Sequence, residues 1–151
     1  MRAEQKLARI LKENNLTIAL AESITCGLLS HKLGSISSTS DILKGAIICY
    51  DESVKLSLLK IPEKIIKEHT AESQIVTDKL ALHLKKLIPA DIHAGITGLA
   101  SQGGSETNAK PVGTVYISVL FRQKINRKRK VFKGSPLEIK NKASTFLFSF
   151  I

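Results

Sequence analysis

Apolar residues recur along the chain with two different periods. Over residues 3–13 the period is that of a helix with one buried face. The apolar side chains predicted on that face are Ala3, Leu7, Ile10 and Leu11. Elsewhere the apolar residues form short continuous runs bounded by polar or glycine residues, which is typical of buried strands. These runs predict strands at 17–21, 45–50, 92–97 and 112–121.

Helical patterns separate the predicted strands. We expect helices at about 25–33 and 52–59, a further one with Pro62 in its first turn, and a last one that begins at Ser135. The last helix opens with a capping box, because its serine is followed by proline at the first helical position and by glutamate at the third. The segment 73–87 predicts the longest helix. Its expected buried positions are Ile75, Leu80, Leu84 and Leu87.

The alternation of strands and helices predicts an α/β fold, with a sheet covered by helices on both faces. The length of 151 residues suits a single domain over 1–151 with a proper core. No apolar run approaches the roughly 20 residues that span a bilayer. The N-terminus is charged rather than signal-like, so we expect a cytoplasmic protein that does not bind membranes.

The most informative segment joins the first predicted strand to the next helix. It reads Leu20-Ala21-Glu22-Ser23-Ile24-Thr25-Cys26-Gly27. This arrangement delivers the Ser23 hydroxyl to a helix N-terminus, where unpaired amides and the helix dipole can stabilise an oxyanion. The alternative is that Ser23 or Thr25 only caps the helix, because both residue types are favoured caps.

Two later segments carry further candidate chemistry. The strand Gly45-Ala46-Ile47-Ile48-Cys49-Tyr50 is followed by Lys55, five residues after the tyrosine. The segment Gly95-Ile96-Thr97-Gly98 opens a glycine-rich loop that passes through Gly103-Gly104 to Lys110-Pro111-Val112-Gly113-Thr114-Val115.

With these motifs in this order, the chain resembles the CinA C-terminal domain family, which includes bacterial nicotinamide mononucleotide deamidases. The resemblance extends from about Leu7 to the predicted last helix. It implies a three-layer α/β/α sandwich with a mixed β-sheet, and a homo-oligomer of two or more copies. It also implies an amidase in which Ser23, Tyr50 and Lys55 are the catalytic residues.

The chain departs from the usual pattern of this family at four places near the motifs. Cys26 stands where the first of two glycines is usual, and Asp51-Glu52 stands where Ser-Asn usually follows the tyrosine. Ser101-Gln102 replaces Gly-Pro in the glycine-rich loop, and Ser135-Pro136 follows Gly134 in place of Asp-Arg. These changes bear on substrate identity and on whether the activity is retained.

The residue types support an amidase that needs no metal or cofactor. A serine hydroxyl is a weak nucleophile until a base removes its proton. The histidines are scattered and none lies in a matching motif: His31, His69, His83 and His93. A lysine amine can take the proton where burial disfavours its charged form, and a tyrosine can relay it. Taken singly, Tyr50 could be a strand-end aromatic and Lys55 an exposed helix lysine; their joint spacing with Ser23 favours catalysis.

The substrate implied by the resemblance is nicotinamide mononucleotide, whose cationic pyridinium ring makes the carboxamide carbonyl electrophilic. Its phosphate requires amides or cations, and glycine lets backbone amides approach an anion closely. The candidate substrate-binding residues are Thr25, Gly27, Thr97, Gly98, Gly103, Gly104 and Lys110. For the glycine-rich loop, an ordinary long turn before the next strand is an equally good interpretation.

The net charge of +10 is concentrated in one stretch. Seven basic side chains and no acidic one lie between Arg122 and Lys133. Such a cluster can bind nucleic acid or steer anionic ligands. No aromatic residues alternate with the basic ones, so we favour a solvated hairpin tip, with a strand over 115–121, a turn region over 124–129 and a return at Val131-Phe132.

Three functions therefore remain open. The first is hydrolysis of nicotinamide mononucleotide, and the second is hydrolysis of another small amide in an altered pocket. The third is a non-catalytic module that binds a partner through the basic hairpin, although we do not favour nucleic acid as that partner. Cys26 and Cys49 both lie in candidate site segments, and without a secretory context we expect free thiols rather than a disulfide.

Overall fold

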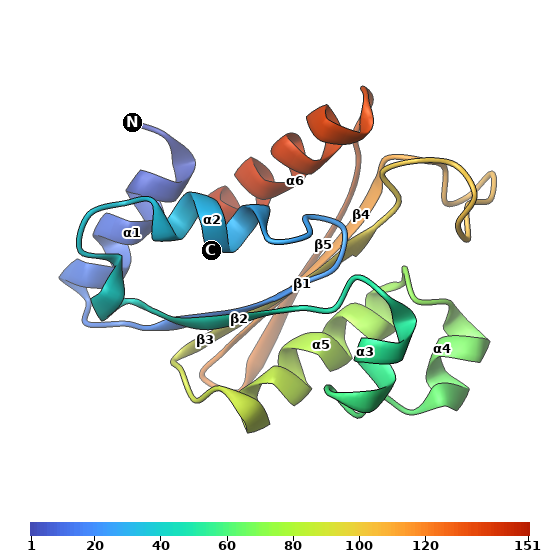
Figure 1. Ribbon diagram of the computed structural model, residues 1–151. Helices are drawn as coiled ribbons and strands as arrows, with labels where there is room; N and C mark the ends of the chain where they lie inside the picture. The colour runs from blue at the N-terminus through green and yellow to red at the C-terminus, as the bar shows by residue number, and fades with distance from the viewer.

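Five strands form one mixed sheet with the spatial order β2-β1-β3-β4-β5 (Figure 1). The computed structural model describes all residues, 1–151. The strands are β1 (Ile18–Glu22), β2 (Leu43–Ile48), β3 (Ile92–Gly98), β4 (Thr114–Phe121) and β5 (Lys124–Val131). The central strand β1 runs parallel to both β2 and β3, whereas β4 and β5 are antiparallel additions on one side. The predicted mixed sheet is thus confirmed.

Helices cover both faces of the sheet, as Figure 1 shows. One layer consists of α1 (Ala3–Glu13), α2 (Leu28–Gly34) and α6 (Pro136–Phe150). The other consists of α3 (Glu52–Ser57), α4 (Glu63–His69) and α5 (Gln74–Leu87), and a short 3₁₀ turn, Thr39–Asp41, precedes β2. The chain is therefore a three-layer α/β/α sandwich, as expected.

The strand β1 explains how the two layers share one sheet. All five of its residues are buried, which suits a parallel strand covered on both faces. Its side chains alternate, so that Ile18 and Leu20 enter the apolar cluster under α1, α2 and α6, while Ala19 and Ala21 enter the cluster under α4 and α5. A buried strand of this kind holds its C-terminal end, where Ser23 follows, in a fixed place.

The glycine at position 95 lets α5 lie close to the sheet. A Cβ atom added there would stand 2.8 Å from the carbonyl oxygen of Thr77 and 3.0 Å from the Cβ of Leu80. Only a residue without a side chain fits this separation, so Gly95 determines how closely α5 packs on β3.

Several predicted helical features are confirmed. The first helix spans residues 3–13, and α6 begins with the predicted capping box, in which the Ser135 hydroxyl accepts from the Glu138 amide and the Glu138 carboxylate accepts from the Ser135 amide. The prediction that 73–87 is the longest helix is wrong, because α6 has 15 residues and α5 has 14. Three apolar residues expected on buried faces are exposed: Ile10, Ile75 and Leu87.

The second helix begins later than the predicted residue 25. It starts at Leu28, because residues 23–27 form a turn in which Cys26 and Gly27 both have positive φ values, 47° and 92°. Helical backbone requires negative φ, so the turn excludes these residues from the helix.

The basic stretch is a strand and not a hairpin tip. Lys124–Val131 pairs along its whole length with β4, in register from Phe121 opposite Lys124 to Thr114 opposite Val131. The turn consists only of Arg122 and Gln123, whose φ values of 47° and 66° suit a two-residue hairpin turn. The predicted turn over 124–129 is therefore wrong. Charged side chains are tolerated there because β5 lies at the edge of the sheet.

None of the helices combines the length and the apolar composition that crossing a membrane requires.

Candidate active site

Ser23 lies on a tight turn at the end of the buried strand β1. Its backbone amide donates to the carbonyl of Ile96 on β3 (3.1 Å), and its own carbonyl accepts from the Cys26 amide (3.1 Å). The left-handed residues Cys26 and Gly27 then reverse the chain into α2. The sheet and the turn together place the Ser23 side chain at the carboxyl edge of the parallel strands, which is the usual place for ligand sites in α/β folds.

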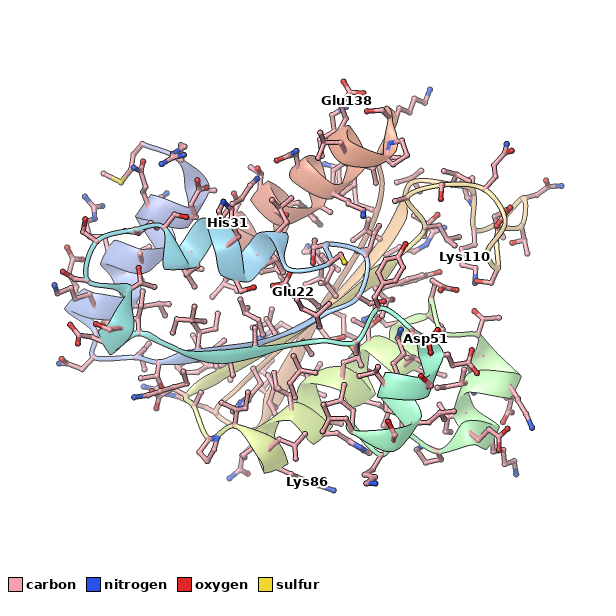
Figure 2. All side chains as sticks on the ribbon, in the orientation of Figure 1. Glu22, His31, Asp51, Lys86, Lys110 and Glu138 are labelled. Carbon is pink, nitrogen blue, oxygen red and sulfur yellow. The ribbon has the colours of Figure 1, made fainter.

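The carboxylate of Glu22 fills the N-terminus of α2. It is fully buried and accepts four hydrogen bonds, from the Thr25 hydroxyl (2.7 Å) and from the amides of Gly27 (3.0 Å), Leu29 (3.0 Å) and Ser30 (2.8 Å) (Figure 2). An acid at this position is favoured by the helix dipole. Glu22 thereby locks together the strand end, the serine turn and the start of α2.

The prediction that amides at the start of α2 stabilise an oxyanion beside Ser23 is wrong, because the Glu22 carboxylate occupies those amides. Those of Gly27, Leu29 and Ser30 bind the carboxylate and do not face a reacting group. The alternative, that Ser23 or Thr25 caps the helix, is also wrong, since the N-cap residue is Gly27 and the side chain that accepts from the first amides is that of Glu22. The amides of Ile24 and Thr25, directly after the serine, make no hydrogen bond within the protein.

Lys55 is buried against Ser23. Its side chain comes from α3, is only 1% exposed, and places Nζ 3.1 Å from the Ser23 hydroxyl. Nζ also donates to the carbonyls of Cys49 (2.6 Å) and Tyr50 (3.3 Å). The interpretation of Lys55 as an exposed helix lysine is therefore wrong.

All three partners of Lys55 are oxygen atoms within hydrogen-bond reach of Nζ. A neutral amine has two N–H groups and one lone pair. In that form the two carbonyls can accept from its N–H groups and the lone pair can accept from the Ser23 hydroxyl, whereas an ammonium group would donate to all three oxygens. The site therefore holds a hydroxyl and a buried amine in direct contact.

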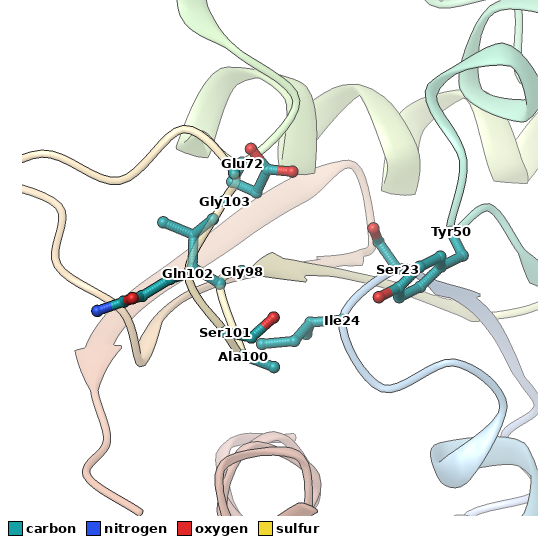
Figure 3. Close-up of a pocket in the computed structure, with 11 residues that line it drawn as sticks. Ser23, Ile24, Tyr50, Glu72, Gly98, Ala100, Ser101, Gln102 and Gly103 are labelled. Atoms are coloured by element: carbon teal, nitrogen blue, oxygen red, sulfur yellow. The ribbon is translucent and has the colours of Figure 1, made fainter. Parts of the chain in front are cut away.

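Tyr50 lies in the same cleft but forms no hydrogen bond with the serine. Its side chain is 61% exposed and lines the cleft next to Ser23 (Figure 3). Its hydroxyl makes no hydrogen bond to Ser23 or Lys55, and the contact to Lys55 is through its backbone carbonyl. On its ring, at 5.6 Å from the centroid, lies the ammonium group of Lys140 from α6.

The cleft has a volume of about 220 Å³ and lies between the serine turn and the glycine-rich loop (Figure 3). One side carries Ser23, Ile24 and Tyr50. The other carries Glu72 and the loop residues 98–104, among them Ser101 and Gln102. The two residues that replace the family's usual Gly-Pro thus supply polar side chains to the cleft wall.

The glycines predicted to bind phosphate line the cleft but already have an internal partner. The amides of Gly103 and Gly104 each donate to the Glu106 carboxylate at 2.8 Å. These amides hold the pKa of the Glu106 carboxyl below its ordinary value. A ligand phosphate could use the same two amides only after displacing Glu106. Gly98 also lines the cleft, and a Cβ there would lie 2.5 Å from the Thr114 carbonyl oxygen.

Four other predicted substrate-binding residues lie behind the cleft wall and do not line it. Thr25 and Gly27 bind Glu22, as described above. The Thr97 hydroxyl is buried and pairs with the Thr77 hydroxyl at 2.8 Å. Lys110 donates to the hydroxyls of Thr70 (2.7 Å) and Ser105 (2.7 Å) and to the backbone carbonyl of Glu72 (3.0 Å), and burial lowers its pKa.

Three residues at the candidate site were not predicted from the sequence: Glu22, Glu72 and Lys140. Glu22 carried a usable signal, because an acid that ends an all-apolar strand must find buried donors. Glu72 and Lys140 carried no such signal, since only the tertiary fold brings Glu72 to the cleft wall and Lys140 to the ring of Tyr50.

Both cysteines are free thiols, as expected. Cys26 is exposed, whereas Cys49 is buried behind Lys55, and burial raises the pKa of the Cys49 thiol to about 11. Nowhere do three or more His, Cys, Asp or Glu side chains come together in a group that could hold a metal ion.

Comparison with known sequences identifies one family. The model of the CinA C-terminal domain matches residues 1–151. A CinA-like protein from Thermotoga neapolitana is 36% identical over 141 residues, which are 93% of this chain and 34% of that protein. A CinA-like protein from Prochlorococcus marinus is 44% identical over 114 residues, 75% of this chain and 26% of that protein. The chain thus spans about a third or less of the length of these relatives.

Solved structures have the same fold over nearly the whole chain. The competence damage-inducible protein A (ComA) from Klebsiella pneumoniae superimposes with a TM-score of 0.92 at 24% identity, covering 99% of this chain and 94% of that one. A competence-damaged protein (CinA) superfamily protein from Enterobacter cloacae gives 0.91 at 26% identity, with 98% and 87% covered.

Proposed function

The chain belongs to the CinA C-terminal domain family, and from this premise we propose that it is a serine amidohydrolase that converts nicotinamide mononucleotide to nicotinate mononucleotide and ammonia. The family includes nicotinamide mononucleotide deamidases. The observation that carries the proposal is the direct contact between the buried Nζ of Lys55 and the Ser23 hydroxyl, 3.1 Å apart, at the wall of an open cleft.

The proposed first step is acylation of Ser23. Its oxygen attacks the carboxamide carbon while Lys55 takes the hydroxyl proton. The tetrahedral oxyanion needs donors that are not already bound, and the amides of Ile24 and Thr25 meet this condition. Lys55 then returns the proton to the amide nitrogen, the C–N bond breaks, and ammonia leaves.

The second step returns the enzyme to its starting state. Water attacks the acyl-serine, Lys55 accepts one of its protons, and the Ser23 oxygen leaves with that proton. The product carries a carboxylate where the substrate carried a carboxamide. Tyr50 takes part by placing its carbonyl on Lys55 and its ring on the cleft wall.

Lys140 is the best-placed ligand for the phosphate. Among the lysines near the cleft, Lys55 and Lys110 already donate to three oxygens each. The side chain of Lys140 has no hydrogen bond or ion pair, and its ammonium lies over the ring of Tyr50. An anion at this side of the cleft would therefore meet an uncommitted cation.

A second candidate function is hydrolysis of a different small amide. The observation that favours it is the polar lining contributed by Ser101 and Gln102, which stand where the family usually has Gly-Pro. Extra donors and acceptors in a cleft wall change which substrate is bound.

Ammonia release from nicotinamide mononucleotide by the purified chain tests the proposal. We expect turnover by the native chain and a loss of at least about a thousandfold in kcat in Ser23→Ala, because the nucleophile is gone. Ser101→Ala is the matched control, since it removes a hydroxyl from the same cleft that has no contact with Lys55, and we expect it to keep measurable kcat. No ammonia from a folded native chain would contradict the proposed substrate, and equal turnover by Ser23→Ala would contradict the mechanism.

A further inference from the structure

One wall of the cleft carries a carboxylate that forms no ion pair. Glu72 is half-buried, immediately precedes the Ser73 cap of α5, and lines the cleft. Figure 3 shows it on the opposite side of the cleft from Ser23 and Tyr50. Its Oε2 accepts from the Ser105 hydroxyl, its Oε1 makes no hydrogen bond, and no lysine or arginine forms an ion pair with it.

The absence of an ion pair is unexpected in this chain. Lysine and arginine outnumber aspartate and glutamate by 23 to 13. The nearest cation that contacts this segment, Lys110, binds the backbone carbonyl of Glu72 and the Ser105 hydroxyl, not the carboxylate. The Glu72 charge therefore acts on Lys110 without direct contact. A positively charged group in the cleft, placed against the carboxylate, would interact with it more strongly, because the interaction of two charges grows as their distance falls.

The opposite wall carries an aromatic ring that already has one cation near it, the Lys140 ammonium 5.6 Å from its centroid. The ring of Tyr50 is largely exposed and lines the cleft next to the nucleophile. An aromatic face attracts positive charge. A flat cationic ring that presents its carboxamide to Ser23 would therefore lie between a carboxylate and an aromatic ring.

We propose that Glu72 makes this cleft select carboxamides whose ring bears a positive charge, as in a pyridinium, over neutral rings of the same shape. This inference rests on the proposed function, because it assigns charge recognition to the same site. It makes Glu72 a specificity residue for the substrate ring and separates that role from phosphate binding by Lys140.

Binding to the Ser23→Ala chain tests the proposal without consuming the ligand. The two probes are nicotinamide mononucleotide, with a cationic ring, and its dihydro form, with a neutral ring and the same carboxamide, ribose and phosphate. We expect Kd for the cationic form to be lower by about tenfold, which corresponds to one favourable charge pair of about 1.4 kcal/mol. In Ser23→Ala/Glu72→Gln this ratio should fall to about one, through weaker binding of the cationic form alone.

The choice of glutamine separates charge from structure. In Glu72→Gln the side chain keeps its size and an oxygen that can accept from Ser105, so the loop contact is preserved. The control is Glu68→Gln, which removes the same charge from α4 four residues earlier and outside the cleft. We expect it to leave the ratio unchanged.

Three results would overturn the role of Glu72. These are an unchanged ratio in Glu72→Gln, an equal loss of affinity for both probes, and the absence of binding by either probe to Ser23→Ala. A native chain that binds the cationic form selectively through Glu72 but releases no ammonia would contradict the proposed function alone.

Discussion

At the scale of single residues, we propose two separable roles for Lys55. It is buried and its Nζ contacts the hydroxyl of Ser23, the proposed nucleophile, and it also donates to the carbonyls of Cys49 and Tyr50. Removing it would therefore affect both chemistry and stability, since buried polar groups without partners cost about 1–3 kcal/mol. Two substitutions separate the roles.

Lys55→Met should lower both kcat and the free energy of unfolding, the latter by about 1–3 kcal/mol, because the two carbonyls lose their donor. Lys55→Arg keeps N–H donors but has no lone pair to accept a proton. It should lose at least about a hundredfold in kcat, the size of a general-base contribution. Ammonia release and urea unfolding measure the two effects, with the exposed Lys67→Met as control. Appreciable turnover by Lys55→Arg would exclude Lys55 as the base.

The contact between Ser23 and Lys55 could be predicted from the sequence, whereas the wall of the cleft could not. The motif spacing places a serine after one strand and a lysine after the neighbouring strand, and parallel neighbours end at the same edge. Glu72 and Lys140 come from an interhelix segment and from the last helix, far from either strand in sequence. Their positions depend on how α5 and α6 pack, and residue spacing does not determine that packing.

At the scale of elements, the parallel strands β1 and β3 are tied together where they begin. The amide and hydroxyl of Thr17 both donate to the Asp91 carboxylate, at 2.8 and 2.7 Å, and the Asp91 amide donates back to the Thr17 hydroxyl at 3.1 Å. These hydrogen bonds hold the pKa of the Asp91 carboxyl below its ordinary value of 3.8. They fix the start of the strand that ends at Ser23.

The lowered pKa of Asp91 predicts a pH-dependent contribution to stability. A carboxyl with a depressed folded-state pKa stabilises the fold above its unfolded pKa, here about 3.8, and this contribution is lost as pH falls through the folded-state pKa. Asp91→Asn should therefore be less stable than the native chain at pH 6, and the difference should shrink below about pH 3.8. Urea unfolding from pH 6 to pH 2.5 measures it, with Asp41→Asn as an exposed control. A difference that does not vary with pH would rule out this linkage.

The elements themselves were predictable where local chemistry decides them. The first helix follows from its apolar period and the last from its capping box. The start of α2 could not be predicted, because the turn depends on the left-handed Cys26 and on Glu22 taking the amides. The strand β5 was missed because its eight residues are almost all charged or polar, and its pairing comes from β4.

At the scale of the whole molecule, the positive charge is placed along an open edge of the sheet. The strand β5 pairs only with β4, so its outer backbone groups are available to another strand. Its basic side chains divide between the two faces: Arg127 pairs with Asp78, while Lys128 and Lys130 lie over phenylalanine rings on the α6 side. Charges along an edge strand oppose edge-to-edge pairing of two copies. We therefore expect any homo-oligomer to form through another surface.

Removing two of these charges should allow the edge strand β5 to pair with the same strand of a second copy. In Lys128→Thr/Lys130→Thr, threonine favours strand structure and no longer repels a second copy. We expect this variant to form larger species than the native chain in size-exclusion chromatography with light scattering, while ammonia release per chain stays unchanged. The matched control is Lys64→Thr/Lys67→Thr, which removes the same charge from α4 and leaves the edge intact. If both variants have the mass of the native chain, the charges on β5 do not protect the edge. If both associate equally, net charge alone keeps the copies apart.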